Sequence, residues 1–292
     1  MTIANANVSL RPLVGLIGAN IQRSRAPALF EDACAAVGLR GHYHLMDLDL
    51  LAGRTTADLL AAARTAGLSG FNVTYPCKEV VLPLLDEVSE EARQIGAVNT
   101  VTIGKDGRTT GYNTDRIGFR RSLEETFGRA AVDGKAVLMV GAGGAGRAVA
   151  FALCDLGVRE FLIHDNRPAQ AEAVAEAIGR HVGPGRARVV ADPAVVLGSV
   201  AGAVNATPVG MTGIAGVPLD VSALLPTAWV ADVIYSPLET ELLKRAQARG
   251  AKTMGGAGMC VHQAAESFRL FTGRTADVER LRRTFVAAGG SS

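Results

Sequence analysis

The clearest chemical motif in the sequence is a glycine-rich turn at residues 141–146. It reads GAGGAG between an apolar run at 137–140 and an apolar helical run, and GxGxxG between a strand and a helix is typical of dinucleotide binding. The first glycine permits the tight turn, the second admits a pyrophosphate against the backbone, and the third lets helix and strand pack closely. The helix N-terminus adds N–H groups and the positive end of its dipole. We therefore expect this turn to bind the phosphates of a dinucleotide.

The end of the next predicted strand, 161–164, indicates which dinucleotide. Asp165 follows that strand, where an acidic side chain accepts hydrogen bonds from the ribose diol of NAD and repels the 2′-phosphate of NADP. Arg167 lies close enough to favour that phosphate instead, and a third interpretation makes Asp165 only the cap of the next helix. We expect NAD to be preferred, with NADP as the alternative.

Polar residues also lie beside predicted strands in the first half of the chain, among them Lys78, Asn99 and Asp115. Ligands of open α/β sheets bind at such strand ends. Taken singly, each residue has a plain structural explanation: a solvated lysine, a turn amide and a helix cap. Beside a dinucleotide motif they favour a dehydrogenase, because hydride transfer from an alcohol needs a proton acceptor and an orienting partner.

Composition excludes several classes of protein. Thirty Lys and Arg against 28 Asp and Glu leave a net charge of +2, so we expect no nucleic-acid partner. The four cysteines lack zinc or redox spacing and predict reduced thiols, and His42 and His44, with no third ligand, predict no metal site. Residues 1–12 show no secretory pattern, and the apolar stretch 136–154 is broken by Arg147 and by glycines, so we expect no membrane span. The prediction is a cytoplasmic protein, monomer or homodimer, that acts on a small molecule.

Length and pattern predict two α/β domains, because short apolar strands alternate with segments of helical period over 292 residues. The predicted strands are 13–17, 43–46, 70–73, 98–103, 109–112, 136–140, 161–164, 188–190, 202–205 and 229–233. The predicted helices are 27–37, 56–66, 117–127 with Thr114 or Asp115 as its cap, three helices that begin near residues 145, 169 and 239, and 259–270 and 276–287. Turn residues at 105–108 predict a hairpin at a sheet edge. A polar interval near residue 130 divides the chain into 1–128, to which 258–292 returns, and 129–257.

Seven motifs follow one another along the chain. They are Asn72-x-Thr74-x-Pro76-x-Lys78, GAVNT at 96–100, Asn113-Thr114-Asp115, GAGGAG at 141–146, VNATPVGM at 204–211, Asp232-x-x-Tyr235 and Gly256-x-x-Met259-x-x-x-Gln263-Ala264. Together, from about Leu13 to Gly273, they resemble the shikimate/quinate dehydrogenase family. The resemblance implies an N-terminal α/β substrate domain and a Rossmann-type dinucleotide-binding domain, with the C-terminal helices packing back on the first domain and the active site between the two. It also implies reversible NAD(P)-dependent oxidation of a ring hydroxyl, of shikimate to 3-dehydroshikimate or of quinate to 3-dehydroquinate, in aromatic amino acid biosynthesis or quinate metabolism.

Carried over by position, the resemblance makes Lys78 the catalytic lysine and Asp115 its partner carboxylate, which also binds substrate. A lysine partly removed from water loses its proton more readily, and a nearby aspartate favours the charged form, so the amine can act as acid or base. The other substrate-binding positions are Ser24, Thr74, Asn99, Tyr235 and Gln263. The cofactor-binding positions are Gly141, Ala142, Gly143, Gly144, Ala145, Gly146, Asp165, Arg167, Asn205, Thr207, Val233 and Gly256.

One position departs from the family's pattern. Ser24 matches the first hydroxyl of a Ser-x-Ser or Ser-x-Thr pair that clamps the substrate carboxylate, but Ala26 stands where the second hydroxyl belongs. A hydrogen bond to a charged group contributes roughly 1.5–3 kcal/mol, so binding is weakened or redirected unless Gln22, Arg23 or Arg25 compensates. Alternatively, the substrate differs at the ring carbon that bears the carboxylate, as quinate does from shikimate, or is a related cyclitol acid such as aminoshikimate.

Two other functions stay open at this point. A non-catalytic homologue would bind pathway metabolites with the same fold, but it would not need both Lys78 and Asp115. A folate-type two-domain dehydrogenase has a similar organisation, yet its site resembles Tyr-x-x-x-Lys, and Tyr75 lies only three residues before Lys78.

Overall fold

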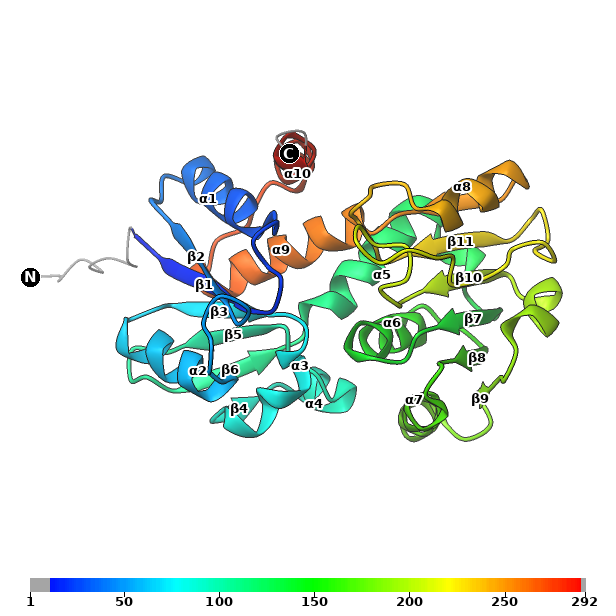
Figure 1. Ribbon diagram of the computed structural model, residues 1–292, viewed down its shortest axis with the longest axis horizontal. Helices are drawn as coiled ribbons and strands as arrows, with labels where there is room; N and C mark the ends of the chain where they lie inside the picture. Colours follow the sequence, from blue (N-terminus) through cyan, green and yellow to red (C-terminus); the bar gives the residue numbers. More distant parts are fainter. Residues whose placement is uncertain (1–10, 290–292) are drawn as a thin grey trace, which may run out of the picture. The chain divides into compact units, whose positions relative to one another are not determined.

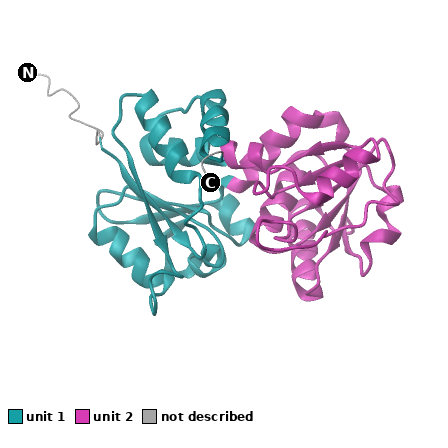
Figure 2. Ribbon diagram, turned by 45° about the horizontal axis from the view of Figure 1, so that its top comes forward, with its two compact units in different colours: residues 1–114, 263–292 teal, residues 115–262 magenta. Residues whose placement is uncertain are grey.

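The protein, described at residues 11–289 by a computed structural model, is an α/β chain that divides into two compact units (Figures 1 and 2). The first unit comprises residues 1–114 and 263–292, and the second comprises residues 115–262. The segment at 1–10, where we expected no secretory pattern, lies outside the described residues.

The first unit is built on a mixed sheet with the strand order β2-β1-β3-β5-β6-β4. The strand β5 is antiparallel to both of its neighbours, β3 and β6, whereas the other pairings are parallel. The first residue of β5 therefore lies at the same edge as the last residues of β1, β3 and β6. The strands are β1 (Leu13–Gly18), β2 (His42–Asp47), β3 (Gly70–Val73), β4 (Glu87–Val88), β5 (Thr100–Ile103) and β6 (Thr109–Tyr112).

Local sequence signals explain where the helices of this unit begin. Pro27, whose fixed φ suits a first turn, lies at the start of α1, and Thr55 and Asp58 form a reciprocal capping box at the start of α2. The helices are α1 (Ala26–Ala36), α2 (Thr56–Thr65), α3 (Cys77–Val80), α4 (Glu90–Ile95), α10 (Val278–Gly289) and all but the first turns of α9 (Ala257–Thr272).

Two local predictions are wrong in detail. The hairpin of β5 and β6 is confirmed, but it is not at the sheet edge, because β4 pairs with the outer side of β6; a two-residue strand shows no alternation in the sequence. The helix α5 (Thr114–Phe127) begins at Thr114, so Thr114 and Asp115 lie inside its first turn and do not precede it as caps. The N–H of Thr114 is instead satisfied by Asn99 Oδ1, at 2.7 Å, from the neighbouring strand's start.

The second unit has a fully parallel sheet with the strand order β12-β11-β10-β7-β8-β9. Counted from β7, this is the order 3-2-1-4-5-6 of doubly wound dinucleotide-binding sheets, and it confirms the predicted Rossmann-type domain. The order reverses between β7 and β10, so a ligand is expected beyond the carboxyl ends of these strands. The strands are β7 (Ala136–Val140), β8 (Glu160–His164), β9 (Ala187–Val189), β10 (Gly202–Asn205), β11 (Trp229–Asp232) and β12 (Lys252–Met254).

The helix α5 contributes to the core of this second unit. Its Phe119 and Leu123 are fully buried in one cluster with Val137 and Met139 of β7. Burial of such side chains against the sheet is the main favourable term that holds a helix in place. The unit accordingly begins at the start of α5, and its other helices are α6 (Gly144–Asp155), α7 (Pro168–Val182) and α8 (Glu241–Ala248).

The C-terminal helix α10 packs back on the first unit, as predicted. The Arg280 guanidinium donates two hydrogen bonds to the carboxylate of Asp32 in α1, at 2.7 and 2.8 Å, and Thr284 donates a third at 2.8 Å. The hydrogen bond from Arg280 lowers the pKa of Asp32. A charged Asp32 therefore strengthens the link between α1 and α10.

Two of the sequence predictions concern membrane spans and the state of the cysteines. No helix between residues 11 and 289 is long and apolar enough to cross a bilayer. All four cysteines are described, and none is in a disulfide. Burial raises the pKa of Cys34 to about 11 and that of Cys154 to about 12, so both stay protonated thiols.

Replacement of Asp32 by asparagine should weaken the attachment of α10. We expect the free energy of unfolding to fall by about 1 kcal/mol at pH 7, because the pair is partly exposed and screened. The pKa of Asp32 is lowered in the folded state, so its contribution is present above about pH 4 and is lost as the pH falls through the lowered pKa. Urea unfolding of the two proteins should thus give stabilities that converge at acid pH.

The control for this measurement is Glu279→Gln, which removes an exposed partner of Arg282 from the same helix. It should change the stability by less than about 0.5 kcal/mol. A difference between Asp32→Asn and wild type that stays constant down to pH 3 would contradict the role of the Asp32 charge.

Candidate active site

Polar residues from three segments lie at one edge of the first sheet. Ser24 follows β1, Thr74 and Lys78 follow β3, and Asn99 precedes β5. Backbone hydrogen bonds tie these segments together: the N–H of Thr74 donates to Ile17, and the N–H of Val98 donates to the carbonyl of Lys78, at 2.9 Å each. The sheet topology therefore gathers residues that the sequence separates by up to 75 positions.

Asn99 is the centre of the polar contacts at this edge. Its side chain is buried, its Nδ2 donates to Thr114 Oγ1 at 3.0 Å and to Gln263 Oε1 at 3.3 Å, and its Oδ1 accepts the N–H of Thr114. Asp115, also buried, follows Thr114 directly in the chain. These bonds bring Asn99, Thr114 and Gln263 together, and they leave the Asn99 amide largely occupied by protein groups.

The carboxylate of Asp47 fixes the loop that carries Ser24 by accepting hydrogen bonds from it. This carboxylate accepts hydrogen bonds from the N–H groups of Asn20 and Ile21 and from Gln22 Nε2, at 2.9 to 3.2 Å. Burial alone would raise the pKa of Asp47, but these bonds outweigh it and lower the pKa, so the group stays charged. Asn20 adopts a positive φ of 55°, which asparagine tolerates in tight turns.

The same loop shows which side chains are available beside Ala26. Gln22 is bound to Asp47, and Arg25 donates to the carbonyl of Phe285 at 3.1 Å and lies over its ring at 4.3 Å. Arg23 is exposed and makes no hydrogen bond or ion pair with the residues that the structure describes. Among the three residues named as substitutes for the missing hydroxyl, Arg23 is therefore the one not engaged elsewhere.

The glycine-rich turn after β7 has three different steric environments. Gly141 has a φ of +101°, and a side chain there would lie 2.8 Å from the backbone of Ala206 after β10. A side chain at Gly146 would overlap the carbonyl oxygen of Gly141. A methyl group at Gly143, in contrast, would meet no described atom beyond its chain neighbours within 4 Å. The space that a pyrophosphate needs is thus present at the middle glycine and at the N-terminus of α6.

Asp165 closes this turn from the end of β8. Its Oδ2 accepts the N–H of Ala142 at 2.8 Å, its Oδ1 accepts the N–H of Arg167 at 2.9 Å, and its side chain is only 8% exposed. The cap position of α7 is Arg167 and not Asp165, so the interpretation of Asp165 as a helix cap is wrong. The Arg167 side chain is 67% exposed and donates to Gln170 at 2.7 Å.

The end of β10 is shaped by side chain to backbone bonds. Asn205 Oδ1 accepts the N–H of Thr207 at 2.9 Å and its hydroxyl at 2.7 Å, and Asn205 Nδ2 donates to Asp232 at 3.0 Å. Burial raises the pKa of Asp232, and the hydrogen bonds that it accepts oppose that rise. Asn205 thereby fixes the loop that faces Gly141.

The segment after β11 completes this side of the second sheet. Val233 donates its N–H to the carbonyl of Asn205 at 3.0 Å, and Gly256 donates to Ile234 at 2.9 Å. A side chain at Gly256 would overlap the carbonyl of Val233, so only glycine fits there. Tyr235 is half-buried next to these residues in the chain. The cofactor positions predicted at Val233 and Gly256 therefore adjoin the loop of Asn205 and Thr207.

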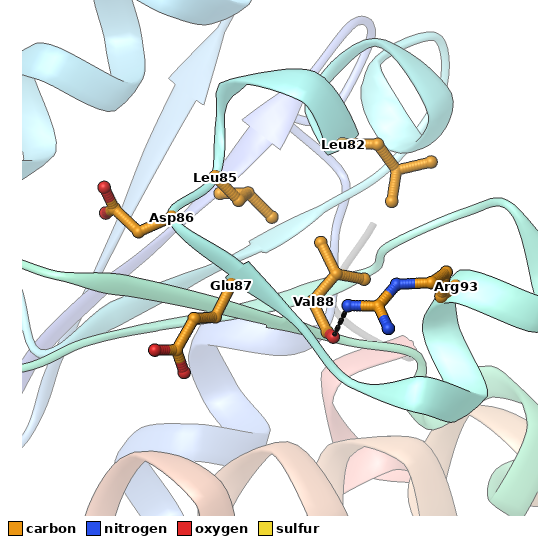
Figure 3. Close-up of a pocket in the computed structure, with 6 residues that line it drawn as sticks. All are labelled: Leu82, Leu85, Asp86, Glu87, Val88 and Arg93. Carbon is orange, nitrogen blue, oxygen red and sulfur yellow. Dashed lines mark hydrogen bonds between the residues drawn. The ribbon is translucent and has the colours of Figure 1, made fainter.

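Other features lie apart from the predicted residues. A surface hollow of about 530 Å³ is lined by Leu82, Leu85, Val88 and Arg93 together with Asp86 and Glu87, around β4 (Figure 3). A second hollow, of about 470 Å³, lies between Gly210 and Lys244. His42 pairs with Glu31 at 3.2 Å, and residues 11–289 contain no group of three or more His, Cys, Asp or Glu that could hold a metal.

Three supporting residues were not predicted. Tyr43 and Asp47 lie in β2, and Ser267 lies in α9. Tyr43 and Ser267 bind Asn72, and Asp47 binds the loop of Ser24. No local pattern in the sequence joins these positions.

Known proteins resemble this chain over nearly its whole length. Residues 16–101 match the family model of the shikimate dehydrogenase substrate binding domain, and residues 256–284 match that of the shikimate 5'-dehydrogenase C-terminal domain. The quinate/shikimate dehydrogenase (NAD(+)) of Corynebacterium efficiens is 48% identical over 279 residues, 94% of this chain and 98% of that protein. The shikimate dehydrogenase (NADP(+)) of Streptomyces avermitilis is 44% identical over 286 residues, 96% and 97% of the two chains. Quinate dehydrogenase from Corynebacterium glutamicum in complex with NAD superposes with a TM-score of 0.89 at 45% identity, covering 95% of this chain and 99% of that chain.

Alanine substitutions at Gly143 and Gly146 should separate ligand space from packing. Gly143→Ala fills open space, so we expect an unfolding temperature within about 2 °C of wild type but at least tenfold weaker binding of NAD. Gly146→Ala forces a methyl group against the backbone and should also lower the unfolding temperature by about 3–8 °C. Thermal unfolding and titration of NAD check both variants. Unchanged NAD affinity in Gly143→Ala would contradict this assignment of the turn.

Proposed function

Because this chain belongs to the shikimate/quinate dehydrogenase family, we propose that it oxidises a ring hydroxyl of shikimate, quinate or both, reversibly and with NAD as the preferred cofactor. The observation that carries the proposal is the open space at Gly143, beside Asp165, where the strand order of the parallel sheet reverses. The high identity to a quinate/shikimate dehydrogenase (NAD(+)) supports both the substrate class and the cofactor.

We propose that the two parts of the chain bind different ligands. Residues 1–128 with 258–292 bind the ring acid and carry the catalytic groups, and residues 129–257 bind the dinucleotide. We further propose that the protein acts in the cytoplasm as a monomer or homodimer, without nucleic acid or membrane as a partner.

Lys78 and Asp115 are the proposed catalytic pair. Oxidation of the hydroxyl requires its proton and its C–H hydride to leave for different acceptors, and bound NAD supplies the hydride acceptor. The Nζ of Lys78 takes the hydroxyl proton, and in the reverse direction it returns this proton to the ketone oxygen. Asp115 orients the ammonium group and the substrate hydroxyl. The backbone bond between Lys78 and Val98 supports a fixed location for the backbone that carries this half-buried side chain.

The remaining groups bind the substrate and the cofactor. Thr74, Asn99, Tyr235 and Gln263 hold the ring hydroxyls, and Ser24 holds the carboxylate. The glycine-rich turn binds the pyrophosphate, while Asp165 accepts hydrogen bonds from the adenosine ribose in exchange for the one that it receives from the N–H of Ala142. Asn205, Thr207, Val233 and Gly256 line the nicotinamide half.

Ala26 favours a second candidate substrate class. A carboxylate clamp with one hydroxyl and a neighbouring arginine makes a different set of contacts from a clamp with two hydroxyls. A related cyclitol acid, such as aminoshikimate, therefore stays a candidate. We propose that exposed Arg23 supplies the missing contact to the carboxylate.

Replacement of Lys78 by methionine tests the catalytic assignment against a role in metabolite binding alone. We expect kcat to fall by a factor of about 10² to 10⁴, because the proton acceptor is lost, while the dissociation constant for NAD stays within twofold. The measurement is NADH formation at 340 nm with shikimate, quinate and aminoshikimate. Lys105→Met, in the turn between β5 and β6, is the control and should keep wild-type kcat. A Lys78→Met protein with wild-type turnover would overturn the assignment.

The cofactor preference depends on Asp165. We expect kcat/KM to be higher with NAD than with NADP in the wild type, because the carboxylate repels the 2′-phosphate. Asp165→Ala should reduce the ratio of the two kcat/KM values by about tenfold or more. Steady-state kinetics with both cofactors provide the test, and Asp192→Ala, at the start of a short 3-10 helix elsewhere in the second unit, is the control. A wild-type protein that prefers NADP would contradict the proposal.

A further inference from the structure

A buried hydrogen-bond network lies within the first unit, next to the residues proposed to bind the ring acid. Its members are polar side chains of β2, β3, β5, α5 and α9 and of the residue before β5: Tyr43, Asn72, Asn99, Thr100, Thr114, Gln263 and Ser267. All except Gln263 are at most 9% exposed. Because buried polar groups must find partners, the direction of each bond constrains the next one.

The network starts at the hydroxyl of Tyr43. This hydroxyl donates to Asn72 Oδ1 at 2.9 Å, so the Asn72 nitrogen faces the other way. Asn72 Nδ2 lies 2.9 Å from Thr100 Oγ1, 3.0 Å from Ser267 Oγ and 3.1 Å from the carbonyl of Asn99. A flipped amide would set two oxygens against each other at Asn99. The orientation of Asn72 is therefore fixed from both sides.

Three hydroxyl groups, those of Thr100, Ser267 and Thr114, connect Asn72 to Gln263. The two hydrogens of Asn72 Nδ2 face three acceptors, and a Thr100 or Ser267 hydroxyl that accepts one of them keeps its own hydrogen to donate. Thr100 donates to Asn99 Oδ1 at 3.1 Å, and Ser267 lies 3.2 Å from Thr114 Oγ1. Thr114 in turn donates to Gln263 Oε1 at 3.3 Å. Thr100 Oγ1 also lies 3.0 Å from Ser267 Oγ and 3.2 Å from Thr114 Oγ1, and Thr114 Oγ1 lies 3.2 Å from Asn99 Oδ1. The hydroxyls therefore form one connected set between Asn72 and Gln263.

The end of the network determines what Gln263 offers to a ligand. Gln263 Oε1 accepts from both Asn99 Nδ2 and Thr114 Oγ1, at 3.3 Å each. Its Nε2 makes no hydrogen bond to any residue in the described part of the chain. The amide therefore presents N–H donors, and these suit a hydroxyl or a ketone oxygen, because both accept hydrogen bonds.

We propose that this network presets Gln263 as a donor to an oxygen of the ring acid, with Tyr43 and Ser267 as positioning residues for substrate binding. The proposal rests on the proposed function, in which Gln263 contacts the substrate. Loss of the Tyr43 hydroxyl leaves Asn72 Oδ1 without that donor, so the hydroxyls downstream can reverse. Gln263 Oε1 then keeps Asn99 Nδ2 as a donor but loses the Thr114 hydroxyl, and the Gln263 amide is held less firmly.

The kinetic test uses Tyr43→Phe and Ser267→Ala, each of which removes one hydroxyl. Each should raise KM for the ring acid about 3- to 10-fold, the effect of one lost or misdirected hydrogen bond, while kcat and KM for NAD stay within twofold. Thr272→Val is the matched control, because it removes a buried hydroxyl of α9 that bonds to Phe268 outside the network. It should leave KM unchanged, with an unfolding temperature similar to those of the two test variants.

A double variant shows whether the effect acts through Gln263. In a Gln263→Ala background, Tyr43→Phe should raise KM no further, because coupled residues are not additive. Equal increases in both backgrounds, or a Tyr43→Phe protein with wild-type KM, would overturn the proposal.

A measurement without substrate separates this proposal from the proposed function. If the wild type oxidises none of the ring acids, the proposed function fails, and the network is tested by the ¹⁵N signals of the Gln263 side-chain amide, assigned by their loss in Gln263→Ala. We expect one sharp pair of signals in wild type and Thr272→Val, and broadened or doubled signals in Tyr43→Phe and Ser267→Ala. Identical signals in all four proteins would overturn the proposal.

Discussion

A buried polar side chain needs hydrogen-bond partners, and this constraint organises the first unit. The amides of Asn72 and Asn99 lie inside the protein, where an unpaired donor or acceptor costs about 1–3 kcal/mol. Their partners come from β5, α5 and α9, so the strands and helices must take up one register for all the bonds to form. The same bonds that satisfy the buried amides also bring Asn99 and Gln263 together.

The antiparallel strand β5 makes this arrangement possible. In an all-parallel sheet the residue before β5 would lie at the opposite edge from the residues that follow β1 and β3. The reversal brings Asn99 to the edge of Thr74 and Lys78 and next to the first turn of α5. Asp115 then takes its place through the chain, one residue after Thr114.

In the second unit, close contacts between backbone segments fix the glycine-rich turn. Gly146 lies against the carbonyl of Gly141, and Gly141 lies against the loop after β10, so the turn has little room to move. Asp165 accepts one hydrogen bond from the N–H of Ala142, which fixes the turn to the end of β8. Of Gly141, Gly143 and Gly146, only Gly143 has open space beside it. A rigid frame around an open position is a suitable site for a phosphate group.

The sequence by itself determined the elements whose signals are local. The turn at 141–146 and the flanking strand and helix follow from glycine spacing and apolar period, and the motifs from Asn72 to Gln263 indicated the family. Only the tertiary structure decided that Asn99 accepts the first N–H of α5 and that Asp165 accepts an N–H of the glycine-rich turn. It also decided that the side chains of Gln22 and Arg25 bind Asp47 and Phe285 and are not available beside Ala26. It also revealed the two-residue strand β4 and the network from Tyr43 to Gln263. These features join residues far apart in the chain, and their bonds depend on strand order and register, which no local pattern specifies.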